Sequence, residues 1–356
     1  MNMPYPHPSV KMPDTIAVPS PVQPTTKISI LIPTYNEASY IVGVLDSVLS
    51  ATPRVHEVLV ADGRSQDATR ELVASVAARD PRVRLVDNPN RIQSAGCNRA
   101  AAVADPDCNV FIRMDAHSSY PPEFIQRLID MLDETEAASV VVRLRSVGKK
   151  CFQRAVAVLS NTVLGTGGAV HRMGVKSGFV DHGHHAAFRR NAYDNAGGYD
   201  ESFVAAEDAE LDHRIRAQGG KIWFAADIVV DYFPRDSVSR LAAQYYRNGI
   251  GRAQAVRKNN GEIRLRQVIP PLSLCFIALG VLASPIYPAT LVLPGAYLLG
   301  MATVSAAYAI IRADACLLAG AVALPVIHLT WAAGFLRSFF FGPPANALPS
   351  AHRGAR

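Results

Sequence analysis

Acidic side chains recur along the first two thirds of this chain, and three times they follow a short apolar run. The three segments read ISILIPTYNE at Ile28–Glu37, VLVADGRSQD at Val58–Asp67 and VFIRMDAH at Val110–His117, and AAED follows at Ala205–Asp208. Such runs are typical of buried parallel strands, and ligands of open α/β sheets gather at the carboxyl ends of the strands. We therefore expect a set of carboxylates to converge on one cleft: Asp62, Asp67, Asp115, Glu207 and Asp208.

Carboxylates brought together in this way indicate a metal-dependent enzyme. Like charges held close together are costly unless they bind a cation or transfer a proton. No GxGxxG follows a strand, no GxxxxGK[ST] occurs, and GTGGAV at Gly165–Val170 does not have the dinucleotide spacing. The sequence therefore favours neither a dehydrogenase nor a P-loop enzyme.

Alternating strand and helix patterns must position these carboxylates. Strands are predicted at Lys27–Pro33, Glu57–Ala61, Val83–Asp87 and Val110–Met114. Helices are predicted at Tyr40–Leu49, from about Asp67, at Gln93–Ala104, from Pro121 with proline in the first turn, and at Ala209–Gln218. This alternation predicts an α/β fold, with a mostly parallel sheet flanked by helices.

The amino-acid composition limits the kinds of molecule that this protein is expected to bind. The 356 residues carry a net charge of +6 that is spread along the chain. No basic stripe with interleaved aromatic residues occurs, so we expect no nucleic-acid partner. The excess charge suits an anionic membrane leaflet or a diphosphate substrate. The cysteines form no CxxC pair, and we expect them to be reduced thiols in a cytosol-facing protein: Cys97, Cys108, Cys151, Cys275 and Cys316.

The C-terminal third predicts membrane helices. No Asp, Glu, Lys or Arg occurs in Val268–Ile311 or in Ala315–Leu336, and a bilayer span needs about 20 apolar residues. Two to three transmembrane or interfacial helices are expected, with a turn at Ser284–Ala289. Basic residues before the first span place the preceding domain in the cytoplasm. A three-span count leaves Arg337 and Arg353 outside, against that bias, so the last segment is alternatively an interfacial or re-entrant helix.

These observations divide the chain into successive regions. We expect a proline-rich flexible tail over residues 1–26 and a catalytic domain over residues 27–251. A basic juxtamembrane linker then covers 252–267, the membrane helices cover 268–337, and a C-terminal tail covers 338–356.

The ordered motifs PTYNE, DGxSxD, Asp115 and Glu207–Asp208 resemble those of the family 2 glycosyltransferases over roughly Lys27 to Gly251. The family's catalytic domain has the nucleotide-diphospho-sugar transferase (GT-A) fold. The stretches Val180–Arg190 and Gln244–Ala253 resemble most the branch that builds succinoglycan-type bacterial exopolysaccharides. The resemblance implies a bacterial inner-membrane enzyme with its catalytic domain facing the cytoplasm, working beside other polysaccharide-assembly proteins.

The resemblance also implies where the donor binds. Taken alone, the PTYNE segment favours a turn that ends a strand, and Asp67 favours a helix cap. Arg91, which follows the third strand, is alternatively a surface arginine. In the family these loops approach the nucleoside, the diphosphate and the sugar, and a QxxRW motif reaches the diphosphate. Here Asn248 replaces its Trp, which suggests one sugar per encounter. The implied nucleotide-sugar-binding residues are Pro33, Thr34, Tyr35, Glu37, Asp62, Arg91, Asp115, Gln244 and Arg247.

A divalent cation and a general base complete the implied chemistry. Asp115 occupies the place of the family's DxD motif, where Mg²⁺ or Mn²⁺ neutralises the diphosphate. His117 replaces the second acid, and it is either a ligand, which suits Mn²⁺ better, or it orients the sugar or a water. Glu207 and Asp208 match the catalytic ED motif, with Asp208 as general base. Without the resemblance, this pair is a helix-start acid pair favoured by the macrodipole.

The loop DHGHH at Asp181–His185 has poor spacing for zinc. By position it resembles the loop that precedes the family's acceptor-site helix, which implies that His184 and His185 contact hydroxyls of the acceptor sugar. The leading hypothesis is an inverting glycosyltransferase that moves a hexose, for which glucose is expected, from a UDP-sugar to a polyprenyl-diphosphate-linked saccharide. A polyprenyl-phosphate sugar synthase is the enzymatic alternative. A membrane scaffold with a degenerate transferase fold is the non-enzymatic one.

Overall fold

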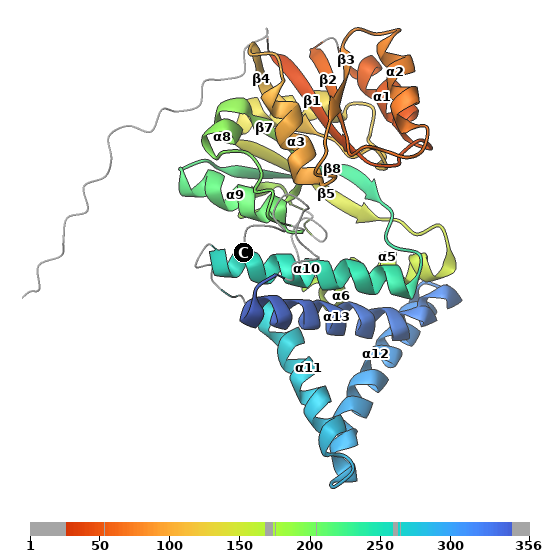
Figure 1. Ribbon diagram of the computed structural model, residues 1–356. Helices are drawn as coiled ribbons and strands as arrows, with labels where there is room; N and C mark the ends of the chain where they lie inside the picture. Colours follow the sequence, from red (N-terminus) through yellow and green to blue (C-terminus); the bar gives the residue numbers. More distant parts are fainter. Residues whose placement is uncertain are drawn as a thin grey trace, which may run out of the picture.

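Eight strands form one mixed sheet in the computed structural model, which describes residues 26–52, 54–167, 174, 176–203, 205–258, 263 and 265–343. The strand order is β3-β2-β1-β4-β7-β5-β8-β6 (Figure 1). The strands are β1 (Lys27–Thr34), β2 (Val55–Asp62), β3 (Val83–Asp87), β4 (Cys108–Arg113), β5 (Ser139–Ser146), β6 (Gly178–Val180), β7 (His184–Arg189) and β8 (Ile222–Tyr232).

The first four strands form a parallel half-sheet that aligns their carboxyl ends. β1 pairs in parallel with β2 and β4, and β2 pairs in parallel with β3. Thr34 at the end of β1 lies opposite Asp62, which in turn lies opposite Asp87. The antiparallel β7 then separates β4 from β5. The predicted α/β class is confirmed, and the register brings the loops after β1, β2 and β3 together at one edge.

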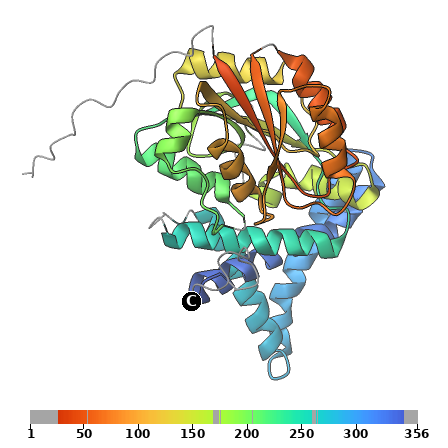
Figure 2. The same cartoon turned by 45° about the horizontal axis from the view of Figure 1, so that its top comes forward.

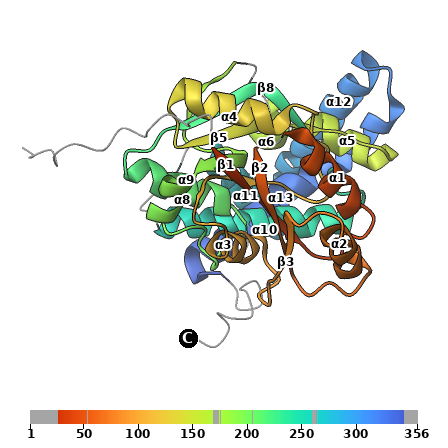
Figure 3. The same cartoon turned by 90° about the horizontal axis from the view of Figure 1, so that it is seen from above.

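Helices cover both faces of this sheet (Figures 2 and 3). Side chains alternate along a strand, so Ile30 and Ile32 enter one core while Leu31 enters the other. The first core includes side chains of α1 (Ile41–Ala51), α2 (Thr69–Ala77) and α4 (Phe124–Thr135). The second includes side chains of α3 (Gln93–Ala102), α8 (Arg190–Asn195) and α9 (Glu207–Ala217).

Two long helices lie side by side below the sheet. In Figure 1, α10 (Val238–Lys258) and α13 (Gly320–Phe341) cross the molecule beneath α9. A Cβ atom added at Gly249 of α10 would come within 2.1 Å of the Trp331 carbonyl oxygen, and one at Gly334 of α13 within 2.1 Å of the Tyr246 carbonyl oxygen. Glycine at both positions therefore permits backbone-to-backbone contact.

A helical hairpin projects from this helix pair. It consists of α11 (Leu265–Ala283), the 3₁₀ helix η1 (Pro288–Leu291) and α12 (Val292–Ile311), and it points away from the sheet in Figures 1 and 2. Among the described residues, the helical stretches Pro288–Ile311 and Ala315–Phe341 are long and apolar enough to cross a membrane. Large apolar side chains are exposed along the hairpin, among them Leu272, Phe276, Leu282, Leu293 and Leu299.

The chain returns from the hairpin to the sheet side through η2 (Ala315–Ala319), which contacts α5 (Cys151–Ser160). Cys151 and Cys316 form a disulfide there, with their Cα atoms 5.0 Å apart. The expectation of five reduced thiols is therefore wrong for these two. Tertiary packing, which their sequence separation of 165 residues conceals, brings them together.

Some expected regions differ from the observed elements. The boundary expected at residue 251 falls inside α10, which continues to Lys258. Most of the two tails, from 1 to 25 and from 344 to 356, and the linker residues 259–262 and 264 lie outside the described part of the chain. A short four-residue helix, α6 (Val163–Thr166), follows α5.

Candidate active site

The loops that follow β1 and β2 are joined by hydrogen bonds into one surface. The Gly63 amide donates to the Thr34 carbonyl at 2.7 Å, and the Glu37 amide donates to the Thr69 hydroxyl at 2.9 Å. The Asn36 amide donates to the Ser65 hydroxyl at 2.8 Å. PTYNE and DGxSxD, separate in sequence, therefore form a single surface at this edge of the sheet.

Within this edge, the candidate nucleotide contacts differ in exposure. Asp62 is fully buried, and its carboxylate accepts hydrogen bonds from Ser65 and, at 2.7 Å, from Arg70. Tyr35 is exposed, and the Arg91 guanidinium carbon lies 5.9 Å from the centre of its ring. Tyr35 and Arg91 thus offer a flat surface and a cation for a nucleotide. The predicted base contact of Asp62 stays a prediction, because here that carboxylate holds its own loop.

Asp115 lies just beyond β4, on the same edge of the sheet. Its side chain accepts a hydrogen bond from the Gln93 amide at 2.7 Å, and its backbone amide donates to the Tyr120 hydroxyl at 2.6 Å. The Arg113 Nε atom is 3.5 Å from a carboxylate oxygen of Asp115. These contacts fix the carboxylate at this edge of the sheet.

His117 is exposed and pairs with Glu37, whose carboxylate lies 2.8 Å from Nδ1. This hydrogen bond raises the pKa of His117, and the nearby Asp115 carboxylate adds to the effect. No described group of three or more His, Cys, Asp or Glu side chains suits a metal ion. One carboxylate and one imidazole oriented by Glu37 nevertheless fit a cation whose remaining ligands are phosphate oxygens.

Asp208, on the first turn of α9, has both of its carboxylate oxygens engaged by neighbouring side chains. One oxygen accepts hydrogen bonds from the Arg113 guanidinium and, at 2.9 Å, from the Tyr199 hydroxyl. The other lies 2.8 Å from Nδ1 of His184. Burial alone would raise the pKa of Asp208, but Arg113 and His184 outweigh it and hold that pKa well below its usual range.

The residue before Glu207 has an unusual backbone conformation. Ala206 has φ +64°, a left-handed value that a residue with a Cβ rarely adopts. Burial, followed by repulsion from Asp208, raises the pKa of the Glu207 carboxyl. Strained backbone of this kind concentrates at functional sites, and it places the ED pair at the start of α9.

Arg113 links the two halves of the site, and the sequence interpretation missed it. Its guanidinium pairs with Asp208 and faces Asp115, so the expected general base and the expected metal ligand share one buried cation. Tyr199, whose ring lies 5.6 Å from the guanidinium carbon, was also missed. A charged residue at the end of the apolar run VFIR is the signal that would have identified Arg113.

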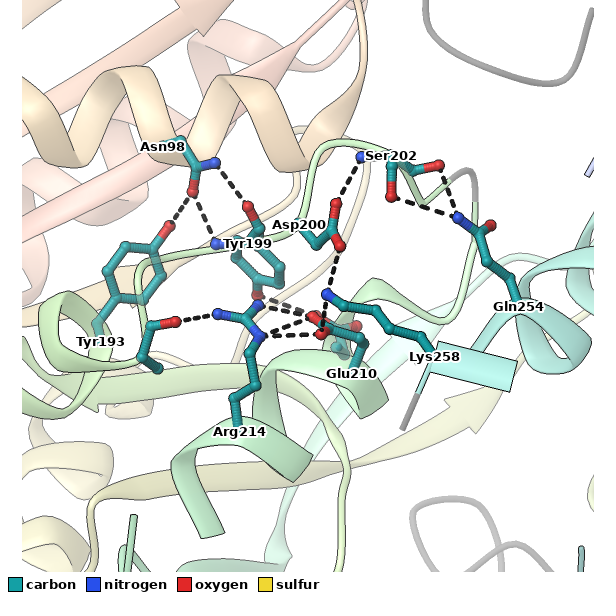
Figure 4. A network of polar contacts seen from close by, with 11 residues as sticks. Asn98, Tyr193, Tyr199, Asp200, Ser202, Glu210, Arg214, Gln254 and Lys258 are labelled. Carbon is teal, nitrogen blue, oxygen red and sulfur yellow. Dashed lines mark hydrogen bonds and ion pairs between the residues drawn. The ribbon is translucent and has the colours of Figure 1, made fainter. Parts of the chain in front are cut away.

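Polar contacts also tie α9 to α10, as Figure 4 shows. The fully buried Glu210 accepts hydrogen bonds from Arg214 and, at 2.7 Å, from Lys258 of α10. Lys258 bonds Asp200 as well, and Gln254 donates to the Ser202 carbonyl at 3.1 Å. The loop and helix that carry Asp208 are therefore fixed to α10.

For three of the expected site residues, no described contact leads to Asp115 or Asp208. Gln244 donates to the Tyr232 hydroxyl at 2.7 Å, at the end of β8, and Arg247 donates to the Ala243 carbonyl of its own helix at 3.3 Å. These contacts do not connect either side chain to Asp115 or Asp208. The side chain of His185 lies outside the described part of the structure.

Comparison with known proteins identifies the class of enzyme to which this site belongs. The family model described as Glycosyl transferase family 2 matches residues 29–197. The chain belongs to this family and is a glycosyltransferase. It is 40% identical to the succinoglycan biosynthesis protein ExoA of Rhizobium meliloti (strain 1021), over 88% of this chain and 95% of that protein.

Two further similarities are more distant. The chain is 37% identical to the polyprenol monophosphomannose synthase of Mycolicibacterium smegmatis, over 32% of this chain and 44% of that protein. The solved structure of the mannosyltransferase PcManGT from Pyrobaculum calidifontis, in complex with GDP-Man and Mn²⁺, superposes with a TM-score of 0.57 at 20% identity. The superposition covers 90% of this chain and 91% of that one. It confirms the expected GT-A fold.

Proposed function

We propose that this glycosyltransferase moves a hexose, with inversion, from a UDP-sugar to a lipid-linked saccharide during bacterial exopolysaccharide synthesis. The observation that carries the proposal is the Asp115–Arg113–Asp208 cluster, which joins a donor-side carboxylate to a base-side carboxylate. The similarity to a succinoglycan biosynthesis protein over most of both chains supports the polysaccharide assignment.

The two carboxylates of this cluster would act on different substrates, Asp115 on the donor and Asp208 on the acceptor. Tyr35, Arg91 and Asp115 would hold the nucleoside diphosphate, and the Asp208–His184 pair would face the acceptor hydroxyl. The acceptor oxygen attacks the anomeric carbon as its proton is withdrawn on the Asp208 side. The bond from that carbon to the diphosphate breaks, and the electron pair leaves with the nucleotide. Attack opposite the leaving group inverts the anomeric configuration.

A divalent cation, Mg²⁺ or Mn²⁺, would neutralise the departing diphosphate. Asp115 would supply an oxygen ligand, and His117, oriented by Glu37, would supply a nitrogen ligand. The imidazole favours Mn²⁺ within this pair of metals. Gln244 and Arg247 would reach the diphosphate only by changing their present contacts.

The proposed donor and acceptor are tested together. Full-length enzyme in detergent is given radiolabelled UDP-glucose, UDP-galactose or GDP-mannose, with Mn²⁺ and a membrane lipid extract. We expect label from UDP-glucose in the lipid fraction, an inverted linkage by NMR, and no transfer after chelation by EDTA. Transfer from GDP-mannose alone would refute the proposed donor, and a retained configuration would refute the mechanism.

We also propose that the α11–α12 hairpin spans the membrane while α13 stays on the side of the catalytic domain. The Arg257 side chain of α10 donates to the Ser338 carbonyl near the end of α13, at 3.0 Å, so the last turns of α13 lie beside the end of α10. Arg337 then lies on the same side as the basic end of α10, in agreement with the positive-inside rule.

A native cysteine tests this arrangement. Cys275 is an exposed free thiol on α11. In sealed vesicles of either orientation, we expect it to resist a membrane-impermeant maleimide until detergent is added. Labelling in intact vesicles would contradict the membrane location of the hairpin.

A polyprenyl-phosphate sugar synthase is the second candidate, favoured by the similarity to polyprenol monophosphomannose synthase. In that case the acceptor is the lipid phosphate itself, and the product is a glycosyl phosphate. Mild acid would then release the free labelled sugar. Under the leading proposal, mild acid releases an oligosaccharide in which the labelled sugar is held by a glycosidic bond.

A further inference from the structure

We propose that Arg235, in the loop between β8 and α10, binds the diphosphate of the donor nucleotide beside the segment Asp115–His117. This inference rests on the proposed function, and it adds to that function a residue that the sequence motifs did not indicate. The guanidinium of Arg235 would contact the phosphate oxygens directly.

The end of β8 lies beside the donor side of the site. The Asp231 amide of β8 donates to the Ser119 carbonyl at 3.4 Å, and these two residues form an isolated antiparallel bridge. Ser119 lies two residues after His117, so the end of β8 adjoins the segment that follows β4. Glu37 raises the pKa of His117, and Arg235 is near enough for its positive charge to oppose that shift. Arg235 and His117 therefore belong to the same region of the site.

The Arg235 side chain is exposed, and it forms no hydrogen bond or ion pair with any residue that the structure describes. The residues on either side of it are fixed by contacts with the start of α5. The Pro234 carbonyl accepts a hydrogen bond from Gln153 at 2.7 Å, and Asp236 pairs with Lys150 at 2.8 Å. A fixed backbone thus presents a guanidinium that is available to a ligand.

Two other arginines of the site are already engaged. Arg113 is buried and paired with Asp208, and Arg247 donates to a backbone carbonyl of its own helix. A nucleoside diphosphate would add negative charge close to the carboxylate of Asp115. A guanidinium is a permanent, planar cation that can donate two parallel hydrogen bonds to phosphate oxygens. Arg235 therefore offers the chemistry that a diphosphate at this position requires.

A lipid-linked acceptor also carries a diphosphate, which a guanidinium would bind in the same way. The position of Arg235 favours the donor, because the loop adjoins the segment of Asp115 and not the Asp208–His184 pair. The two sources of diphosphate are separated by measuring nucleotide affinity and acceptor KM in the same variants.

The test compares Arg235→Gln and Arg235→Lys with Arg240→Gln, which makes the same exchange at an exposed arginine on the first turn of α10. Full-length enzyme in detergent and saturating Mn²⁺ is titrated with UDP by calorimetry and with uridine by saturation-transfer NMR. We expect UDP affinity to fall about 10- to 100-fold in Arg235→Gln, and less in Arg235→Lys, which keeps the charge but not the planar fork. Uridine affinity should not change, and Arg240→Gln should match the wild type.

The Tm of Arg235→Gln should stay within about 2 °C of the wild type, because the side chain has no partner among the described residues. A larger fall would contradict the unpaired position on which the inference depends. UDP affinity within about threefold of the wild type would overturn the inference, and so would equal losses of UDP and uridine affinity. A raised KM for membrane lipid extract with unchanged UDP affinity would assign Arg235 to the acceptor instead.

The proposed function fails separately. If the wild type binds GDP and not UDP, GDP and guanosine replace UDP and uridine in the same comparison, and only the proposed donor is refuted. If the wild type binds neither nucleotide, the proposed function is overturned, and the role of Arg235 with it.

Discussion

Asp208→Asn tests the buried pair at the centre of the site. The Asn side chain keeps the shape of Asp208 but leaves the Arg113 guanidinium, whose side chain is 6% exposed, without its main counterion. Removing one partner of a buried ion pair costs about 3–5 kcal/mol. Asp115, 3.5 Å from Arg113, compensates in part, so we expect the lower end, about 3 kcal/mol.

Because the 356 residues are expected to unfold as one unit, this corresponds to a fall in apparent Tm of about 4 °C. Transfer should fall by about 10²–10⁴, because the pair loses its negative charge, while UDP binding stays close to that of the wild type. Thermal unfolding in detergent and single-turnover transfer measure the two effects. In combination with Arg113→Met, Asp208→Asn should recover part of the lost stability.

Two results would refute this reasoning. A Tm within about 2 °C of the wild type would show that Asp208 and Arg113 do not form a buried pair. Retention of more than about a tenth of the wild-type turnover would show that the proton does not leave through the Asp208–His184 pair.

Three further predictions follow from other contacts. Asp115→Ala should abolish the Mn²⁺ dependence of UDP binding in calorimetry, and unchanged metal-dependent affinity would place the ligand elsewhere. Burial raises the pKa of Asp212 well above its usual range, so its carboxyl destabilises the fold as the pH rises above about 4. The gain in Tm of Asp212→Asn should therefore grow from pH 4 to pH 8, and a gain that shrinks would contradict the shift. Gly334→Ala should cost about 1–3 kcal/mol because its Cβ meets the Tyr246 carbonyl, whereas Gly300→Ala on α12, which meets nothing within 4 Å, should be neutral.

The regular half of the sheet was predictable because its signals are local. The predicted strand at Val83–Asp87 agrees with β3 in both bounds, and the strand at Lys27–Pro33 ends one residue before β1 does. The helix expected from Pro121 begins later, at Phe124. Short apolar runs bounded by clear turn residues suffice for such elements.

The rest depends on contacts that no local pattern contains. The antiparallel β7 owes its place to pairing with β4 and β5, and the pairing of α10 with α13 depends on two glycines far apart in the chain. The motif order identified Asp115 and Asp208 as candidates, but not Arg113, which holds them together. The Cys151–Cys316 disulfide likewise follows from the packing of η2 on α5.

Because α10 contacts both halves of the molecule, they cannot unfold independently. On one face of this helix, Lys258 and Gln254 form hydrogen bonds with Asp200 and Ser202, in the loop before α9. The other face packs against α13 at Gly249. A fragment that ends after α10 would expose that second face to water, and one that ends before α10 would release Asp200 and Glu210 from Lys258. Neither fragment should therefore be as stable as the full chain, and on heating α10 should unfold together with the helices and loops that it joins.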